Sequence, residues 1–83
     1  MAALQEPQVK QSATEVTYDA EADRAYVHVV AATGDGSMKR VVVDDDALPG
    51  PIVVDLDASG RVLGFELVKG SRSLPLKLLH ELR

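Results

Sequence analysis

Apolar residues gather in five short runs along this chain, and polar residues separate the runs. The runs are rich in β-branched and aromatic residues, which are typical of β-strands. They lie at residues 14–18, 24–31, 38–44, 52–57 and 61–68. The breaks between them contain Asp, Gly or Pro, which favour turns and end regular structure. The pattern therefore predicts five strands.

The period of the apolar residues changes near the end of the sequence. Four leucines recur at the spacing i, i+4, i+5 and i+8, which places them on one side of a helix. They are Leu74, Leu78, Leu79 and Leu82. Ser73 suits the N-cap, and Pro75 is tolerated in a first helical turn. Strands followed by a helix predict an α+β fold, in which a C-terminal helix packs on an antiparallel sheet of about five strands.

A chain of 83 residues is long enough for one domain. We predict that residues 1–13, which are polar and aperiodic, form a disordered lead, and that residues 14–83 form a single β-rich domain. The absence of cysteine excludes disulfides, thiolate zinc sites and cysteine nucleophiles. No signal peptide is visible and no apolar run is long enough to span a bilayer, so we expect a cytoplasmic protein without a membrane partner.

Charge is distributed unevenly along the chain, whose net charge is −4. Residues 14–60 carry ten acidic and three basic side chains, a balance of −7, and residues 61–83 carry two acidic and five basic ones, a balance of +3. Neutralised phosphates supply most of the affinity for nucleic acids. The acidic body therefore argues against nucleic acid as a partner.

Residues 51–68 fit two structures that exclude each other. The spacing Asp55-x-Asp57-x-Ser59-Gly60, followed by Glu66, matches the calcium loop of an EF-hand. An EF-hand needs a helix on each side of this loop. Two prolines and a glycine precede the loop, and no amphipathic helical pattern follows it. The same residues fit two strands joined by a turn, so we predict a β-hairpin and no metal site.

The hairpin assigns a role to each turn residue. Asp57 and Gly60 suit the first and fourth positions of a type I turn, and Gly60 suits a left-handed conformation in a bulge. Asp57 then lies opposite Arg61, an opposite-charge pair worth about 0.2–1 kcal/mol. In this register one face carries Val53, Asp55, Leu63, Phe65 and Leu67, and the other carries Ile52, Val54, Leu56, Val62, Gly64 and Glu66.

Both faces of this predicted hairpin are largely apolar. Strands that are apolar on both faces must be covered on both. One short helix covers only one face of a five-stranded sheet, so we expect a second copy of the chain to cover the other. The sequence therefore predicts a homodimer with two-fold symmetry, which acts as a non-catalytic interaction module and binds or neutralises a protein partner.

The alternative function is a small divalent-metal-dependent or acid–base enzyme. Its candidate residues are His28, Asp55, Asp57 and Glu66. Neither His28 nor His80 has a serine, cysteine or second histidine at a spacing typical of a catalytic triad or metal site. The successive acids Asp44, Asp45 and Asp46 alternate across a strand end and cannot all face one ion. We therefore expect no catalytic, metal-binding or cofactor-binding residue.

Two motifs occur in order along the chain. The first reads Tyr18-Asp19-x-Glu21-Ala22-Asp23-x-Ala25-Tyr26-Val27, and the second reads Val53-Val54-Asp55-Leu56-Asp57-x-x-Gly60-Arg61-Val62-Leu63-Gly64-Phe65-Glu66-Leu67. Together they resemble the small bacterial family called domain of unknown function 2283. Ala25 and Phe65 depart from the leucine and isoleucine that are common there. The resemblance implies a small β-rich fold with a helix and no established activity. Some members are encoded beside a toxin-like partner, which suggests an interaction role.

Overall fold

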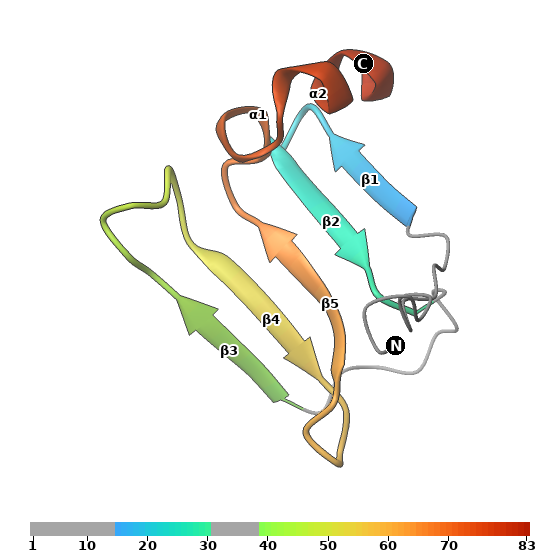
Figure 1. The fold of residues 1–83 in the computed structure, drawn as a ribbon, viewed down its shortest axis with the longest axis vertical. Coiled ribbons are helices and arrows are strands. Elements are labelled where there is room, and N and C mark those ends of the chain that lie inside the picture. Colours follow the sequence, from blue (N-terminus) through green and yellow to red (C-terminus); the bar gives the residue numbers. More distant parts are fainter. Residues whose placement is uncertain (1–14, 31–38) are drawn as a thin grey trace, which may run out of the picture.

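The computed structural model of the chain describes residues 15–30 and 39–83. These residues form one five-stranded antiparallel sheet and two short helices (Figure 1). The elements are β1 (Glu15–Asp19), β2 (Arg24–His28), β3 (Lys39–Val43), β4 (Ile52–Leu56), β5 (Val62–Leu67), α1 (Gly70–Ser73) and α2 (Leu76–Leu82). The predicted α+β fold is confirmed. The predicted disordered lead, residues 1–13, lies outside the described residues.

The strands lie in the order β1-β2-β5-β4-β3, so the sheet consists of two parts that meet between β2 and β5. One part is the β1–β2 hairpin. The other contains the β4–β5 hairpin, with β3 on its outer side (Figure 1). The hairpin interpretation of residues 51–68 is therefore confirmed, and no helix flanks the former calcium-loop candidate on its entry side.

The β4–β5 hairpin contains a β-bulge that the sequence analysis missed. At the turn, the N–H of Asp57 donates to the carbonyl of Arg61 at 2.9 Å, as the predicted register requires. Farther along the hairpin, Asp55 pairs with Gly64, and Leu63 is the extra residue on β5. One extra residue moves every following side chain of that strand to the opposite face.

The predicted assignment of side chains to the two faces is therefore wrong. Ile52 pairs with Leu67 and Val54 pairs with Phe65, so these four apolar side chains share one face. Asp55 lies on the other face, and so does its neighbour across β5, Gly64. The sheet has one apolar face and one polar face. The argument for a dimer from two apolar faces consequently fails, and a dimer needs other support.

Two rows of apolar residues run across all five strands on what we call the apolar face. The first row is Tyr18, Ala25, Leu67, Ile52 and Val43, and the second is Val16, Val27, Phe65, Val54 and Val41. Every member of both rows is apolar or aromatic, as one side of a two-layer domain requires. We call the opposite side of the sheet the polar face.

The C-terminal helices lie at one end of the sheet beside β1 and β2 (Figure 1), and they pack there on the apolar face. Ala25 and Leu67 from the sheet form the buried core with Leu74 and Leu79. The predicted leucine stripe is confirmed for the three leucines in α2, whereas Leu74 lies in the break between α1 and α2. Ser73 is not an N-cap, because it ends α1 and Pro75 occupies the position before α2. No helix of the described residues is long and apolar enough to cross a membrane.

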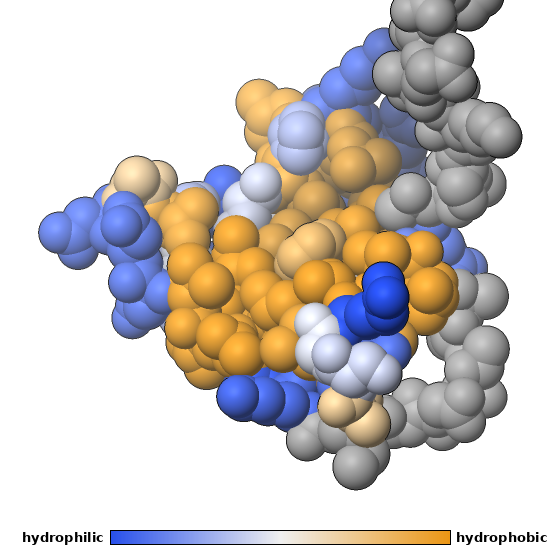
Figure 2. Space-filling view, turned by 60° about the horizontal axis from the view of Figure 1, so that its bottom comes forward, coloured by the Kyte–Doolittle hydropathy of each residue, from blue (hydrophilic) through white to orange (hydrophobic). Residues whose placement is uncertain are grey.

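The helices leave the β3–β4 side of the apolar face uncovered. Val41, Val43, Val54 and Phe65 lie outside the core cluster, and both valines of β3 are exposed. Figure 2 shows apolar side chains gathered into one broad, continuous patch on the surface of the molecule. Soluble proteins rarely expose large contiguous apolar patches without a role in binding.

Candidate functional site

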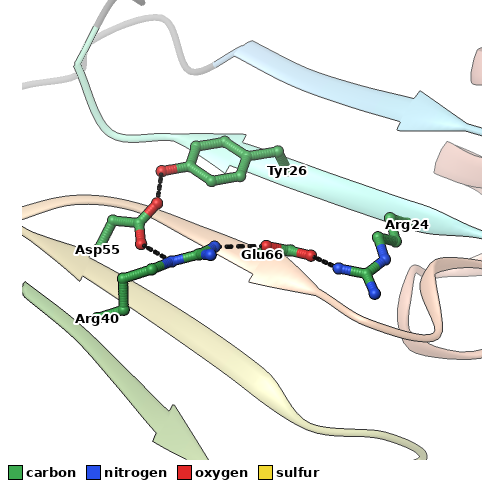
Figure 3. A network of polar contacts seen from close by, with 5 residues as sticks. All are labelled: Arg24, Tyr26, Arg40, Asp55 and Glu66. Atoms are coloured by element: carbon green, nitrogen blue, oxygen red, sulfur yellow. Dashed lines mark hydrogen bonds and ion pairs between the residues drawn. The ribbon is translucent and has the colours of Figure 1, made fainter. Parts of the chain in front are cut away.

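The polar face carries a chain of hydrogen-bonded side chains that connects four of the five strands (Figure 3). Its members are Arg24 and Tyr26 from β2, Glu66 from β5, Asp55 from β4 and Arg40 from β3. We call these five residues the polar network. Because it joins both parts of the sheet, it is the most organised group of polar side chains in the described residues.

Asp55 lies at the centre of the polar network and is only 8% exposed. Its Oδ2 accepts a hydrogen bond from the hydroxyl of Tyr26 at 2.7 Å, and its Oδ1 accepts one from Nε of Arg40 at 2.8 Å. Nη2 of Arg40 donates to Oε1 of Glu66 at 2.6 Å, and Arg24 donates to the other oxygen of Glu66. Hydrogen bonds between ionised groups are about twice as strong as those between neutral groups.

The bulge and a glycine place these side chains. Because the bulge sets Asp55 opposite Gly64, the carboxylate shares a face with Tyr26 and Glu66. The ring of Tyr26 lies against the backbone of Gly64, where a Cβ atom would approach Cε1 of the ring to 2.4 Å. Any larger residue at position 64 would therefore displace the ring from its bond to Asp55.

The surroundings of Tyr26 and Arg40 in the polar network raise the pKa of both groups. Burial, followed by the hydrogen bond to Asp55, raises the pKa of Tyr26 to about 12. The hydrogen bonds to Asp55 and Glu66 raise the pKa of Arg40 above its ordinary value. Tyr26 is thus a neutral donor and Arg40 a permanent cation at physiological pH. A general acid or base works best with a pKa near the working pH, which neither of these groups has.

The raised pKa of Tyr26 predicts a loss of stability in alkali. A folded-state pKa above the unfolded value of 10.0 means that the stabilisation is present below about pH 10 and disappears as pH rises through about 12. The urea midpoint of the wild type should therefore fall more steeply over this interval than that of Tyr26→Phe. Equal slopes for the two proteins would contradict the prediction. The pKa of Tyr18 is also raised, but this residue is present in both proteins and cancels in the comparison.

A second polar cluster joins the β1–β2 turn to helix α1. The carboxylate of Asp23 accepts hydrogen bonds from the hydroxyl of Tyr18 at 2.9 Å and from the N–H and hydroxyl of Ser71 at 2.8 and 2.9 Å. Its backbone carbonyl accepts from the N–H of Gly70 at 2.8 Å. The N–H of Ser71 is the main cause of the lowered pKa of Asp23. Asp23 therefore positions α1 on the sheet, and its φ of 52° is a conformation that Asp tolerates better than most residues.

The structure brings together two of the four candidate residues of the alternative enzyme and leaves Asp57 at the hairpin turn. Asp55 and Glu66 are brought close through Arg40, which binds both carboxylates. The ring of His28 lies beside that of Tyr26, with 4.5 Å between their centroids. Within residues 15–30 and 39–83, no group of three or more His, Asp or Glu side chains could hold a metal ion.

Two acidic sites from the sequence analysis have local roles in turns. Oδ1 of Asp57 accepts hydrogen bonds from the N–H groups of Ser59 and Arg61 at 2.8 and 2.9 Å, and Gly60 has the predicted left-handed φ of 86°. The backbone pairing of Asp57 with Arg61 is confirmed. An ion pair between their side chains is not among those of the described residues, since the Asp57 carboxylate binds backbone instead. Asp45 similarly accepts from the N–H of Ala47 at 2.8 Å.

Sequence reasoning missed the two arginines of the polar network. Arg24 and Arg40 lie near the ends of predicted strands, where the side chain of a basic residue is usually exposed to solvent. A signal exists in the alternation of Arg24 with Tyr26, because alternate residues of a strand share a face. Connecting them to Asp55 and Glu66, however, requires the order of the strands and the position of the bulge.

Comparisons with known proteins give one match. A search of curated proteins and a search of solved structures found no match for the chain. A family model described as "Protein of unknown function (DUF2283)" matches residues 15–71, which include all five strands and the start of α1. The polar network and Asp23 lie within the matched segment. On the strength of this match over most of its length, the chain belongs to the DUF2283 family.

Proposed function

We propose that this protein is a non-catalytic interaction module that forms a homodimer through strand β3. The observation that carries the proposal is the exposure of this strand: all five of its residues are exposed. Three of them are the consecutive valines Val41, Val42 and Val43, and Val42 is 62% exposed. Burying apolar surface is the main driving force of protein association.

The position of β3 supports an edge-to-edge contact. Within the described residues, β3 is the last strand of the sheet, so its outer N–H and C=O groups face away from β4 (Figure 1). Open edges pair readily with another strand, and proteins commonly protect them with proline, bulges or central charges. No proline interrupts β3, and its two charges, Lys39 and Arg40, lie at one end.

The distribution of the valines over both faces favours pairing at the edge over packing of one sheet on another. Val41 and Val43 lie on the apolar face, and Val42 lies on the polar face. A second copy packed on the apolar face would cover the first two and leave Val42 exposed. A strand added beside β3 brings apolar neighbours to all three.

The polar network supports the non-catalytic part of the proposal. Asp55 and Glu66 are the two carboxylates of the polar network. Arg40 binds both of them, and Arg24 also binds Glu66. Such neutralised pairs stabilise a structure but do not supply a free base or nucleophile. The polar network thus holds the sheet together and leaves recognition to the exposed strand.

Sedimentation velocity over a concentration series tests the homodimer. We expect a monomer–dimer equilibrium with a dissociation constant of about 1–10 μM for the wild type. Val42→Glu should give a monomer at about 50 μM with an unchanged circular dichroism spectrum, because each copy would bring a charged carboxylate into the apolar part of the paired edge. Leu76→Glu, at a residue that is 70% exposed on α2, is the matched control and should remain dimeric. A wild type that is monomeric at this concentration would refute the proposal.

A further inference from the structure

We infer that two copies pair antiparallel along β3 in a register centred on Val42, which sets Arg40 and Lys39 of each copy opposite Asp44 and Asp45 of the other. The inference rests on the proposed homodimer and adds the geometry of its interface. Its basis is the charge sequence of β3 and of the residues that follow it, together with the rules of strand pairing.

The segment from residue 39 to residue 45 has a charge gradient. It begins with Lys39 and Arg40, continues with three valines and ends with Asp44 and Asp45. A parallel copy would bring like charges together at both ends. An antiparallel copy places each basic end beside an acidic end, which is the arrangement that a two-fold axis produces.

Symmetry limits the register to a few choices. A two-fold axis between two antiparallel edge strands stands perpendicular to the sheet, so the apolar faces of the two copies lie on the same side. Residues directly opposite each other must then share a face, so the axis passes midway between one residue of the strand and the same residue of the second copy. Within the apolar part of β3 this residue is Val41, Val42 or Val43.

The three registers differ sharply in the pairs that they create. Centring on Val41 sets Lys39 and Arg40 opposite valines, and centring on Val43 sets Asp44 and Asp45 opposite valines. Only the register centred on Val42 sets valine opposite valine at all three positions. It also creates four base–acid pairs, because Arg40 faces Asp44 and Lys39 faces Asp45 twice per dimer. Opposite charges across strands stabilise a sheet, whereas mismatched pairs do not.

The faces of this register agree with the structure of the monomer. On the apolar face, Val41 lies opposite Val43 of the second copy, so the apolar rows of the two sheets become continuous. On the polar face, Arg40 lies opposite Asp44 of the second copy. Arg40 already binds Asp55 and Glu66 through Nε and Nη2, so its charge faces the Asp44 carboxylate of the second copy at longer range.

A charge exchange at Lys39 and Asp45 tests the register without disturbing the polar network. The Asp45 carboxylate also accepts the N–H of Ala47, so Asp45→Asn, which keeps an acceptor there, is the control for that turn contact. Lys39→Asp alone and Asp45→Lys alone should each raise the dissociation constant at least about tenfold, because each sets like charges opposite each other twice per dimer. The double variant restores opposite charges and should return to within about threefold of the wild type. A wild-type dimer that the single substitutions leave unchanged, or that the double substitution does not restore, would overturn the register but not the homodimer. A monomeric wild type would overturn both.

Disulfide formation gives an independent readout of the same register, because the chain has no native cysteine. In the Val42→Cys variant the two copies of residue 42 would lie directly opposite each other across the axis. Their Cα atoms would then be within the roughly 4.4–6.8 Å that a disulfide requires. The thiols of Val41→Cys, the matched control, would be diagonal neighbours at about 7–8 Å. We expect a covalent dimer on a non-reducing gel for the first variant under mild oxidation, and little for the second. Equal or reversed yields would contradict centring on Val42.

Discussion

Replacing Leu79 by alanine is expected to lower the free energy of unfolding by about 2–5 kcal/mol, the range found when a buried leucine loses its side chain. Leu79 is 3% exposed and belongs to the small core that Ala25, Leu67 and Leu74 complete. The described residues contain no large side chain that is fully buried, so few other side chains contribute to the stability of the core. A domain of this size has a total stability of about 4–12 kcal/mol. The substitution would therefore remove a large part of it.

Urea unfolding followed by circular dichroism measures this effect. Leu76→Ala is the matched control, because Leu76 lies on the same helix but is 70% exposed. Its replacement should change the free energy of unfolding by less than about 0.5 kcal/mol. If the two variants unfold at the same urea concentration, α2 is not docked on the sheet through Leu79.

Replacing Asp55 by alanine is expected to lower the free energy of unfolding by about 2–3 kcal/mol. The substitution leaves the Tyr26 hydroxyl without its acceptor, and such an unsatisfied group costs about 1–3 kcal/mol. It also removes one of the two carboxylates that bind Arg40. The Arg40 side chain is 54% exposed, so its guanidinium regains water and the estimate stays below that for a fully buried ion pair.

A double-mutant cycle with Tyr26→Phe isolates the hydrogen bond within this effect. Asp55→Ala and Tyr26→Phe remove the same bond, so their combined loss of stability should be smaller than the sum of the two single losses, by about 1 kcal/mol or more. Urea midpoints of the four proteins supply the cycle. Strict additivity would show that the Tyr26–Asp55 bond contributes nothing to stability.

The strands were predictable from the sequence because their signals are local. Runs of β-branched residues bounded by turn residues located all five strands, and Asp57 and Gly60 located the hairpin turn. The bulge at Leu63 was not predictable, since no turn residue or other local signal in β5 marks the extra residue. A contact from another part of the chain accompanies it: the carbonyl of Leu63 accepts hydrogen bonds from the N–H groups of Val29 and Val30 at 3.0 and 3.4 Å.

The polar network could be predicted only in part for the same reason. Asp55 and Glu66 were singled out by their spacing, first in a calcium-loop pattern that was rejected and then as candidates of the alternative enzyme, and not as partners of arginine. Their real partners come from strands 15 to 42 positions away in the sequence. A one-residue error of register reverses which face a carboxylate occupies, so the arginines could not be matched to it without the bulge.

The contacts of Asp23 imply an order of assembly during folding. Its carboxylate binds Ser71, 48 positions later in the chain, whereas its bond to Tyr18 spans only five positions. Local contacts form with little loss of chain entropy, and distant ones must wait until the intervening chain is arranged. Helices as short as α1 and α2 are unstable alone in water. We therefore expect the β1–β2 hairpin to form early and to present a ready acceptor, and the C-terminal segment to become helical only as it docks there.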